Sequence, residues 1–127
     1  ILLQPTSPFR TSNQIKEAID CYKKSIDIEM VVSVKETRSN PYYVLREENN
    51  EGFLIKSKES NITRRQDLPK VWELNGAIYV IDIKSLKERN LNQFSKVKKY
   101  EMDELSSHDI DTMFDWDVAC TIVNNSL

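Results

Sequence analysis

Two carboxylates separated by one residue, Asp109 and Asp111, are the sharpest candidates for chemistry in the sequence. In an extended segment both side chains would point to one face, while Ile110 points to the other. Such a pair repels itself unless a cation lies beside it. Mg²⁺ is commonly held by one or two carboxylates together with substrate phosphates, so the pattern predicts a Mg²⁺ (or Mn²⁺) site. A second interpretation stays open, in which Asp111 or Thr112 caps a following helix; capping and metal binding are compatible if the residues divide the roles.

Two further polar groups have a chemical interpretation beside a structural one. Arg64 and Arg65 are adjacent and could bind a carboxylate or phosphate, because a guanidinium binds both in a bidentate manner. They could equally belong to a solvated loop with a local contact between Arg64 and Asp67. In the pair Asn75-Gly76, the amide could recognise a sugar hydroxyl and the glycine could let a ligand approach the backbone. The alternative is a turn that leads into a strand.

Gln4 follows the apolar first three residues, which we predict to be the end of a buried strand. An α/β enzyme often keeps ligand-contacting residues in the loop after a strand, so Gln4 is a candidate. Apolar residues at helical spacing predict a helix that is capped by Thr11 or Ser12 and runs to about Ile26. A β-branched strand over residues 30–34 follows it. The order strand, helix, strand predicts a βαβ unit with a parallel sheet, and hence an α/β fold.

The rest of the chain interrupts this pattern and then resumes it. Residues 36–74 lack a helical period and are predicted to form an inserted hairpin within a single domain over residues 1–127. Beyond them, we expect a strand, a short helix, an edge strand and a final helix that follows the acidic pair. The ranges expected for these elements are 42–46 and 53–55 for the hairpin strands, 75–81 and 98–102 for the later strands, and 85–90 for the short helix.

Composition excludes several classes of function. Hydrophobic residues make up 39% of the 127 residues and charged residues 30%, with a net charge of −2, which is typical of a globular protein. No basic arm or long apolar segment is present, so we expect neither a nucleic-acid partner nor a membrane span, and a cytoplasmic location. Cys21 and Cys120 lack the spacing of a zinc site and are expected to be buried free thiols.

Taken in order, these groups resemble the acylneuraminate cytidylyltransferases, also called CMP-sialic acid synthetases. The resemblance covers nearly the whole chain, and we expect it to correspond to the C-terminal part of such an enzyme, without the N-terminal segment that carries the family's nucleotide loop. The segments that carry it are Leu2-Leu3-Gln4-Pro5-Thr6-Ser7-Pro8, Arg10-Thr11, Val31-Val32-Ser33-Val34, Asn40-Pro41, Arg64-Arg65-Gln66-Asp67-Leu68-Pro69, Asn75-Gly76-Ala77-Ile78-Tyr79 and Asp109-Ile110-Asp111-Thr112.

The resemblance implies a doubly wound, GT-A-like nucleotidyltransferase that activates a nine-carbon acidic sugar with CTP and releases pyrophosphate. By position, Gln4 would contact the sugar acid. Asp109 and Asp111 would be the catalytic carboxylates that hold Mg²⁺ against the triphosphate. Asn75 and Tyr79 would lie in the strand that lines the pocket, although Tyr79 from the residues alone is a core aromatic.

The resemblance also assigns the inserted hairpin to homodimerisation, with Arg65 serving the sugar or phosphate of the partner subunit. We expect the isolated 127-residue chain to be inactive. Sialic, legionaminic and pseudaminic acids all remain open as the sugar. Two alternatives are kept: a cytidylyltransferase for another acidic sugar such as Kdo, and a non-catalytic sugar-binding or dimerisation module.

Overall fold

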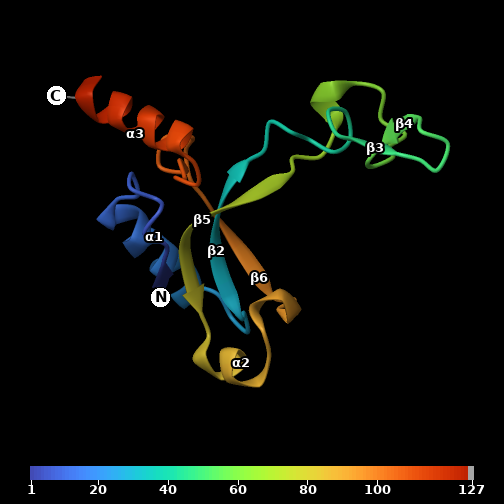
Figure 1. Cartoon of the computed structure of the whole chain (residues 1–127). Helices are drawn as coiled ribbons and strands as arrows, with labels where there is room; N and C mark the ends of the chain where they lie inside the picture. Colours follow the sequence, from blue (N-terminus) through green and yellow to red (C-terminus); the bar gives the residue numbers. More distant parts are fainter. Residues whose placement is uncertain (126–127) are drawn as a thin grey trace. The chain divides into compact units, whose positions relative to one another are not determined.

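The structure is a computed structural model in which residues 1–125 are described (Figure 1). These residues form two compact units. One consists of residues 1–35 together with those from residue 74 onward, and the other of residues 36–73. The first contains a four-stranded sheet and the second a two-stranded hairpin, and each is described by itself.

The four-stranded sheet has the order β1-β5-β2-β6. β1 runs antiparallel to β5, with Leu2 opposite Tyr79, and β2 runs parallel to β6, with Met30 opposite Val97. The strands are β1 (Leu2–Leu3), β2 (Met30–Glu36), β5 (Trp72–Ile81) and β6 (Val97–Glu101).

β5 is antiparallel to β2, so the sheet is mixed and the predicted parallel sheet is wrong. At one end the N–H of Asp82 donates to the carbonyl of Glu29, and further along the N–H of Ile78 donates to Ser33 Oγ. Residue numbers therefore rise in opposite directions on the two strands. β1 and β2 still run the same way around α1, but β5 lies between them. The chain enters β5 without a crossover helix, and antiparallel neighbours need none.

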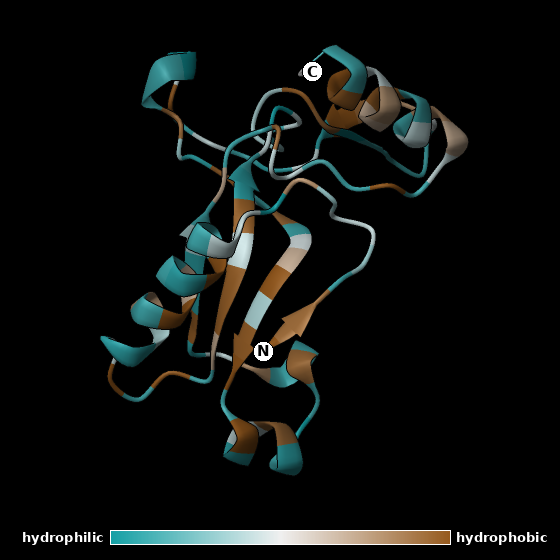
Figure 2. Ribbon diagram, turned by 90° about the vertical axis from the view of Figure 1, so that its left-hand side faces the viewer, coloured by the Kyte–Doolittle hydropathy of each residue, from teal (hydrophilic) through white to brown (hydrophobic). Residues whose placement is uncertain are grey.

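The first helix, α1, extends over Ser12–Lys23 and is capped by Thr11, whose hydroxyl accepts from the N–H of Gln14. It ends before the predicted Ile26, and the turn that follows contains Asp27 with a positive φ of 55°. The apolar side of α1 faces the strands (Figure 2). Ala18 packs there with buried residues of β2 and β5, and the cluster comprises Ala18, Val31, Ala77, Ile78, Val80 and Met102.

Two more helices complete the first unit. α2 (Ile83–Glu88) is capped by Asp82, and α3 (Met113–Asn125) follows the acidic pair. A 3₁₀ turn, η2 (Leu91–Gln93), precedes β6. Across the described part of the chain, the helices are too short or too polar to cross a bilayer. Both cysteines are free as predicted, but Cys120 is exposed and Cys21 half-buried, so the expected burial is wrong for Cys120.

The unit of residues 36–73 contains the hairpin strands β3 (Arg46–Glu48) and β4 (Leu54–Lys56) and the 3₁₀ turn η1 (Arg65–Asp67). Glu47 pairs with Ile55, and Gly52 has a φ of 84° in the connecting turn. The predicted start of the first strand at residue 42 is wrong, because residues 41–44 form a turn. The Asn40 side chain accepts from the N–H of Tyr42, and such local bonds favour turns over strands.

Candidate functional site

Gln4 and Asp109 meet over Gly76, although they are far apart in the sequence. Gly76 lies inside β5 with a φ of 70°. A methyl group added there would overlap Gln4 Oε1, would lie 3.3 Å from Gln4 Cδ and would lie 3.9 Å from Asp109 Oδ2. The glycine is needed both for its backbone conformation and for the space that it leaves to these two side chains. Two predicted site residues thus converge on one point of the sheet.

Arg10 fixes the loop that carries Gln4. Its half-buried Nη1 donates to the backbone carbonyl of Gln4, and lies 3.4 Å from the carbonyl of Ala77 in β5. One guanidinium therefore ties the loop after β1 to the strand beside it. Arg10 was not among the predicted site residues; its place six residues after Gln4, in a segment that carries the resemblance, was the available signal.

Asp109 offers an unused acceptor. Its Oδ1 is buried and has no hydrogen-bond partner among the described residues. Burying a carboxylate oxygen without a donor costs free energy, so such an atom calls for a cation or a donor that a ligand brings. The residue after Asp109, Ile110, ties this segment to the loop after β1, because its N–H donates to the carbonyl of Thr6 at 3.0 Å.

The question of capping is settled in favour of Thr112. Thr112 Oγ1 accepts from the N–H of Asp115 at 3.3 Å, and Asp115 Oδ2 accepts from the N–H of Thr112 at 2.8 Å and from its hydroxyl at 2.7 Å. The Thr112 hydroxyl and N–H hold the pKa of Asp115 below its ordinary value. Asp111 contributes its N–H to Asp115 and is exposed, so its carboxylate is not needed for the cap.

The two carboxylates stay candidates for a Mg²⁺ site of the kind that substrate completes. Among residues 1–125 no group of three or more His, Cys, Asp or Glu side chains is arranged to hold a metal ion. Mg²⁺ keeps several waters and takes one or two carboxylates with substrate phosphates, which agrees with the unused oxygen of Asp109 beside an exposed Asp111.

Asn75 is bonded inside the protein. It is only 5% exposed, its Oδ1 accepts from Ser33 Oγ at 2.6 Å, and its Nδ2 donates to Ser107 Oγ at 2.8 Å. Tyr79 is half-buried and lies opposite Leu2 of β1. Contact of either side chain with a sugar stays a prediction.

Arg65 belongs to the other unit, that of residues 36–73. It is exposed at the start of η1, and its guanidinium carbon lies 4.2 Å from the centre of the Tyr43 ring. A hollow of about 400 Å³ is lined in part by these two residues and by Gln66. Arg65 therefore belongs to a different unit from Gln4 and Asp109, and its service to a sugar or phosphate stays a prediction.

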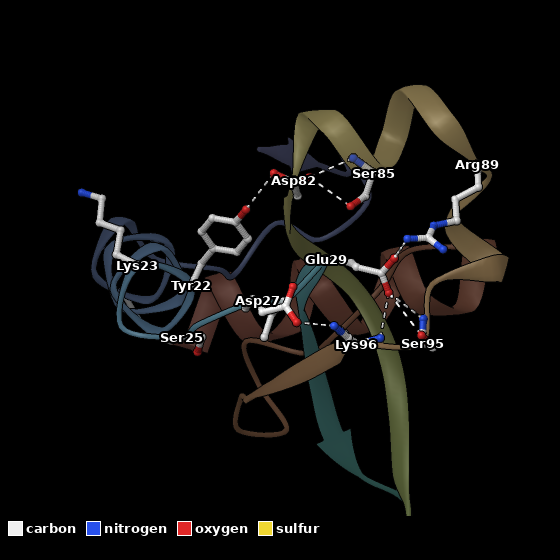
Figure 3. Close-up of a pocket in the computed structure, with 11 residues that line it drawn as sticks. Tyr22, Lys23, Ser25, Asp27, Glu29, Asp82, Ser85, Arg89, Ser95 and Lys96 are labelled. Atoms are coloured by element: carbon white, nitrogen blue, oxygen red, sulfur yellow. Dashed lines mark hydrogen bonds and ion pairs between the residues drawn. The ribbon is translucent and has the colours of Figure 1, made fainter.

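A hollow of about 630 Å³ that was not predicted from the sequence lies where β2 begins and β5 ends (Figure 3). Its carboxylates are already occupied. Glu29 Oε2 accepts from the N–H groups of Lys96 and Ser95, which lower the Glu29 pKa, and Oε1 lies 2.5 Å from Arg89 Nη2. Asp82 caps α2. These groups join the start of β2 to the segments before β6 and after β5. The polar side chains that line the hollow therefore have a structural role.

Comparison with known proteins agrees with the order of these segments. No family model matches the chain. It is 34% identical to an N-acylneuraminate cytidylyltransferase of Streptococcus agalactiae over 117 residues, which is 91% of this chain and 28% of that protein. The resemblance to the acylneuraminate cytidylyltransferases is confirmed.

Two further relatives match most of the chain. The chain is 33% identical to a CMP-N,N'-diacetyllegionaminic acid synthase of Campylobacter jejuni over 90 residues, 70% of this chain and 37% of that protein. It is 28% identical to post-translational flagellin modification protein B of Campylobacter coli over 117 residues, 92% of this chain and 49% of that protein. The chain thus spans half or less of the length of the curated relatives that it matches.

Proposed function

We propose that this protein is a cytidylyltransferase that transfers CMP from CTP to a nonulosonic, sialic-acid-like sugar. The observation that supports this most directly is the meeting of Gln4 and Asp109 over Gly76, since each comes from a different segment of the resemblance. A polar amide and a carboxylate with an unused oxygen at one point of the sheet suit a site that takes a polar sugar and a metal-bound nucleotide.

In the reaction, the anomeric hydroxyl oxygen bonds to the α-phosphorus, the bond from that phosphorus to the bridging oxygen breaks, and pyrophosphate leaves with the electron pair. The hydroxyl proton is released. Such transfer depends mainly on positioning and on neutralising charge. Gln4 orients the sugar acid, and Asp109 with Asp111 would hold Mg²⁺. When bound, Mg²⁺ supplies Lewis-acid polarisation of the phosphate and neutralises the leaving group.

The finer assignments follow from the same proposal. The protein is a cytoplasmic homodimer with a doubly wound, GT-A-like fold, in which the hairpin of residues 36–73 contacts the second copy. Exposed apolar side chains on this unit support a contact surface, with Phe53 64% and Leu54 71% exposed. Arg65 then serves the acid sugar or phosphate of the partner subunit, as an exposed guanidinium can.

A pyrophosphate-release assay tests the proposal, with the full-length protein, CTP, Mg²⁺ and a panel of sialic, legionaminic, pseudaminic and Kdo sugars. We expect release with at least one nine-carbon acid. Release with Kdo alone would support the eight-carbon alternative, and no release with any sugar would refute the enzyme and favour a binding module.

Asp111→Asn tests the metal assignment. We expect it to remove most of the pyrophosphate release, because one of the two carboxylates for Mg²⁺ is lost, while circular dichroism stays that of the wild type. Asp117→Asn is the matched control, since it makes the same change on an exposed residue of α3. Normal turnover by Asp111→Asn would show that the metal assignment is wrong.

A further inference from the structure

We propose that Asn75 is a positioning residue that sets the place of Asp109 through Ser107, rather than a group that only reads the sugar. The proposal deepens the function proposed above and depends on it for the role of Asp109. It rests on a chain of buried hydrogen bonds that begins in β2, passes through Asn75 and ends two residues before Asp109.

The first part of this chain supports the irregular backbone at Gly76. With φ at 70°, Gly76 turns the strand, and the next two N–H groups donate to side chains. The N–H of Ala77 donates to Asn75 Oδ1 at 3.2 Å, and that of Ile78 donates to Ser33 Oγ at 2.7 Å. Ser33 Oγ in turn donates to Asn75 Oδ1 at 2.6 Å. Both N–H groups therefore have a side-chain acceptor in this pair of residues.

The second part joins Asn75 to the segment that carries Asp109. Asn75 Nδ2 donates to Ser107 Oγ at 2.8 Å and lies 3.6 Å from Met102 Sδ. Ser107 is 3% exposed, and its own N–H donates to the carbonyl of Asp103. The segment before Asp109 is thus fixed at a buried point by one amide of the strand.

The Asn75 amide links the strand at Gly76 to the segment that carries Asp109. One amide uses its oxygen to hold the backbone of β5 and its nitrogen to hold the segment before Asp109. This amide thus connects the backbone next to Gly76 to the segment before Asp109, and the side chains of Gln4 and Asp109 both lie close to Gly76. A buried network whose members are all bonded is rigid, so it fixes the carboxylate oxygen for a ligand.

Ser107→Ala is the sharper test, because Asn75→Ala would also leave the N–H of Ala77 and the hydroxyl of Ser33 without their acceptor. Ser106→Ala is its matched control. Ser106 is equally buried at 3% exposed, but it bonds to Asp103 and Gln14 and lies outside the Asn75 network. We expect both variants to lose some thermal stability. Only Ser107→Ala should release the side chain of Asp109.

The measurement is NMR on the labelled protein without metal. In the wild type and Ser106→Ala, the ¹⁵N–¹³Cγ coupling of Asp109 should report one χ1 rotamer, and an NOE should join the Gln4 amide to the Gly76 α protons. In Ser107→Ala, the coupling should move toward the rotamer average and the NOE should weaken. An unchanged coupling, an equal change in both variants, or loss of the folded spectrum in Ser107→Ala alone would overturn the positioning role.

A second arm separates this proposal from the proposed function. Mn²⁺ is titrated with CTP present, and broadening of the Asp109 and Asp111 amide signals is followed. We expect Ser107→Ala to weaken Mn²⁺ binding about tenfold, the lower end of the usual effect of residues that orient ligands, with Ser106→Ala unchanged. Equal affinity in both variants would overturn the role. If the wild type shows no broadening, the proposed metal site fails, while the coupling still decides the role of Asn75.

Discussion

Gly76→Ala tests whether the approach of Gln4 and Asp109 to Gly76 is built into the strand. The substitution adds one methyl group to a residue with a φ of 70°, where side chains are strained. The methyl would overlap Gln4 Oε1 but would be in ordinary contact with Asp109 Oδ2, at 3.9 Å. The substitution should therefore displace the amide and leave the carboxylate nearly in place.

The cost can be worked from these contacts. The left-handed backbone costs about 1–2 kcal/mol for alanine, and moving Gln4 off its rotamer costs about 0.5–1.5 kcal/mol. Lower chain entropy in the unfolded state returns about 0.4–1 kcal/mol. The net loss is about 1–2.5 kcal/mol of the free energy of unfolding. Gly52→Ala is the control, because Gly52 has a φ of 84° with nothing within 4 Å, and it should cost no more than about 1 kcal/mol.

Urea unfolding of the full-length protein checks the loss of stability, and steady-state kinetics check that Gln4 is displaced while Asp109 stays in place. Losing one amide contact to the sugar, about 1–1.5 kcal/mol, should raise the KM for the sugar acid roughly tenfold. The Mg²⁺ requirement should change much less, because Asp109 is not pushed. The reasoning is refuted if Gly76→Ala behaves as Gly52→Ala in both measurements, or if it raises the Mg²⁺ requirement and leaves the sugar KM intact.

Two further predictions concern the cap of α3 and the dimer. Thr112→Ala should lower the free energy of unfolding by about 1 kcal/mol in urea, with Thr121→Ala on the same helix as the milder control. Thr112 holds the pKa of Asp115 below its ordinary value, so the stability from this contact is present above the ordinary aspartate pKa and is lost as pH falls through the lowered pKa. Thr112→Ala should therefore lose less of its free energy of unfolding than the wild type does when the pH is lowered. If Arg65 serves the partner's site, inactive Arg65→Ala and Asp111→Asn proteins should regain about a quarter of wild-type activity when refolded together, since half of the dimers are mixed and each has one intact site. Lack of recovery, with mixed dimers shown by native mass spectrometry, would place Arg65 outside the partner's site.

Local features were predictable from the sequence because neighbouring residues determine them. Thr11 and Gln14 form a reciprocal cap at the start of α1, and such a pair is visible as spacing alone. The β-branched residues 30–34 formed β2 as expected. The turn at residues 41–44 was missed because the Asn40 side chain competes with strand pairing, and aromatic content alone does not reveal that competition.

The order of the strands was not predictable in the same way. β5 lies between β1 and β2 and runs against both, although β1, α1 and β2 are consecutive in the sequence. A strand–helix–strand pattern fixes the direction of its two strands but not whether a third lies between them. The insertion of residues 36–73 removes the crossover that would have marked the next strand as parallel, so the mixed sheet depends on a pairing between distant segments.

The pair Asn75-Gly76 shows why the candidate site could be predicted only in part. By itself the dipeptide is typical of a tight turn, yet here it lies in the interior of a ten-residue strand. The two properties that favour a turn, the positive φ of glycine and the side-chain amide of asparagine, serve another purpose here. The positive φ of Gly76 bends the strand and leaves room for Gln4 and Asp109, and the Asn75 amide accepts an N–H that the bend would otherwise leave unpaired. The residue types indicated that something other than a plain strand was needed at this place. The residue types alone do not reveal the partners of Asn75, which are Ser33 and Ser107, because these bonds join segments 42 and 32 residues apart in the sequence.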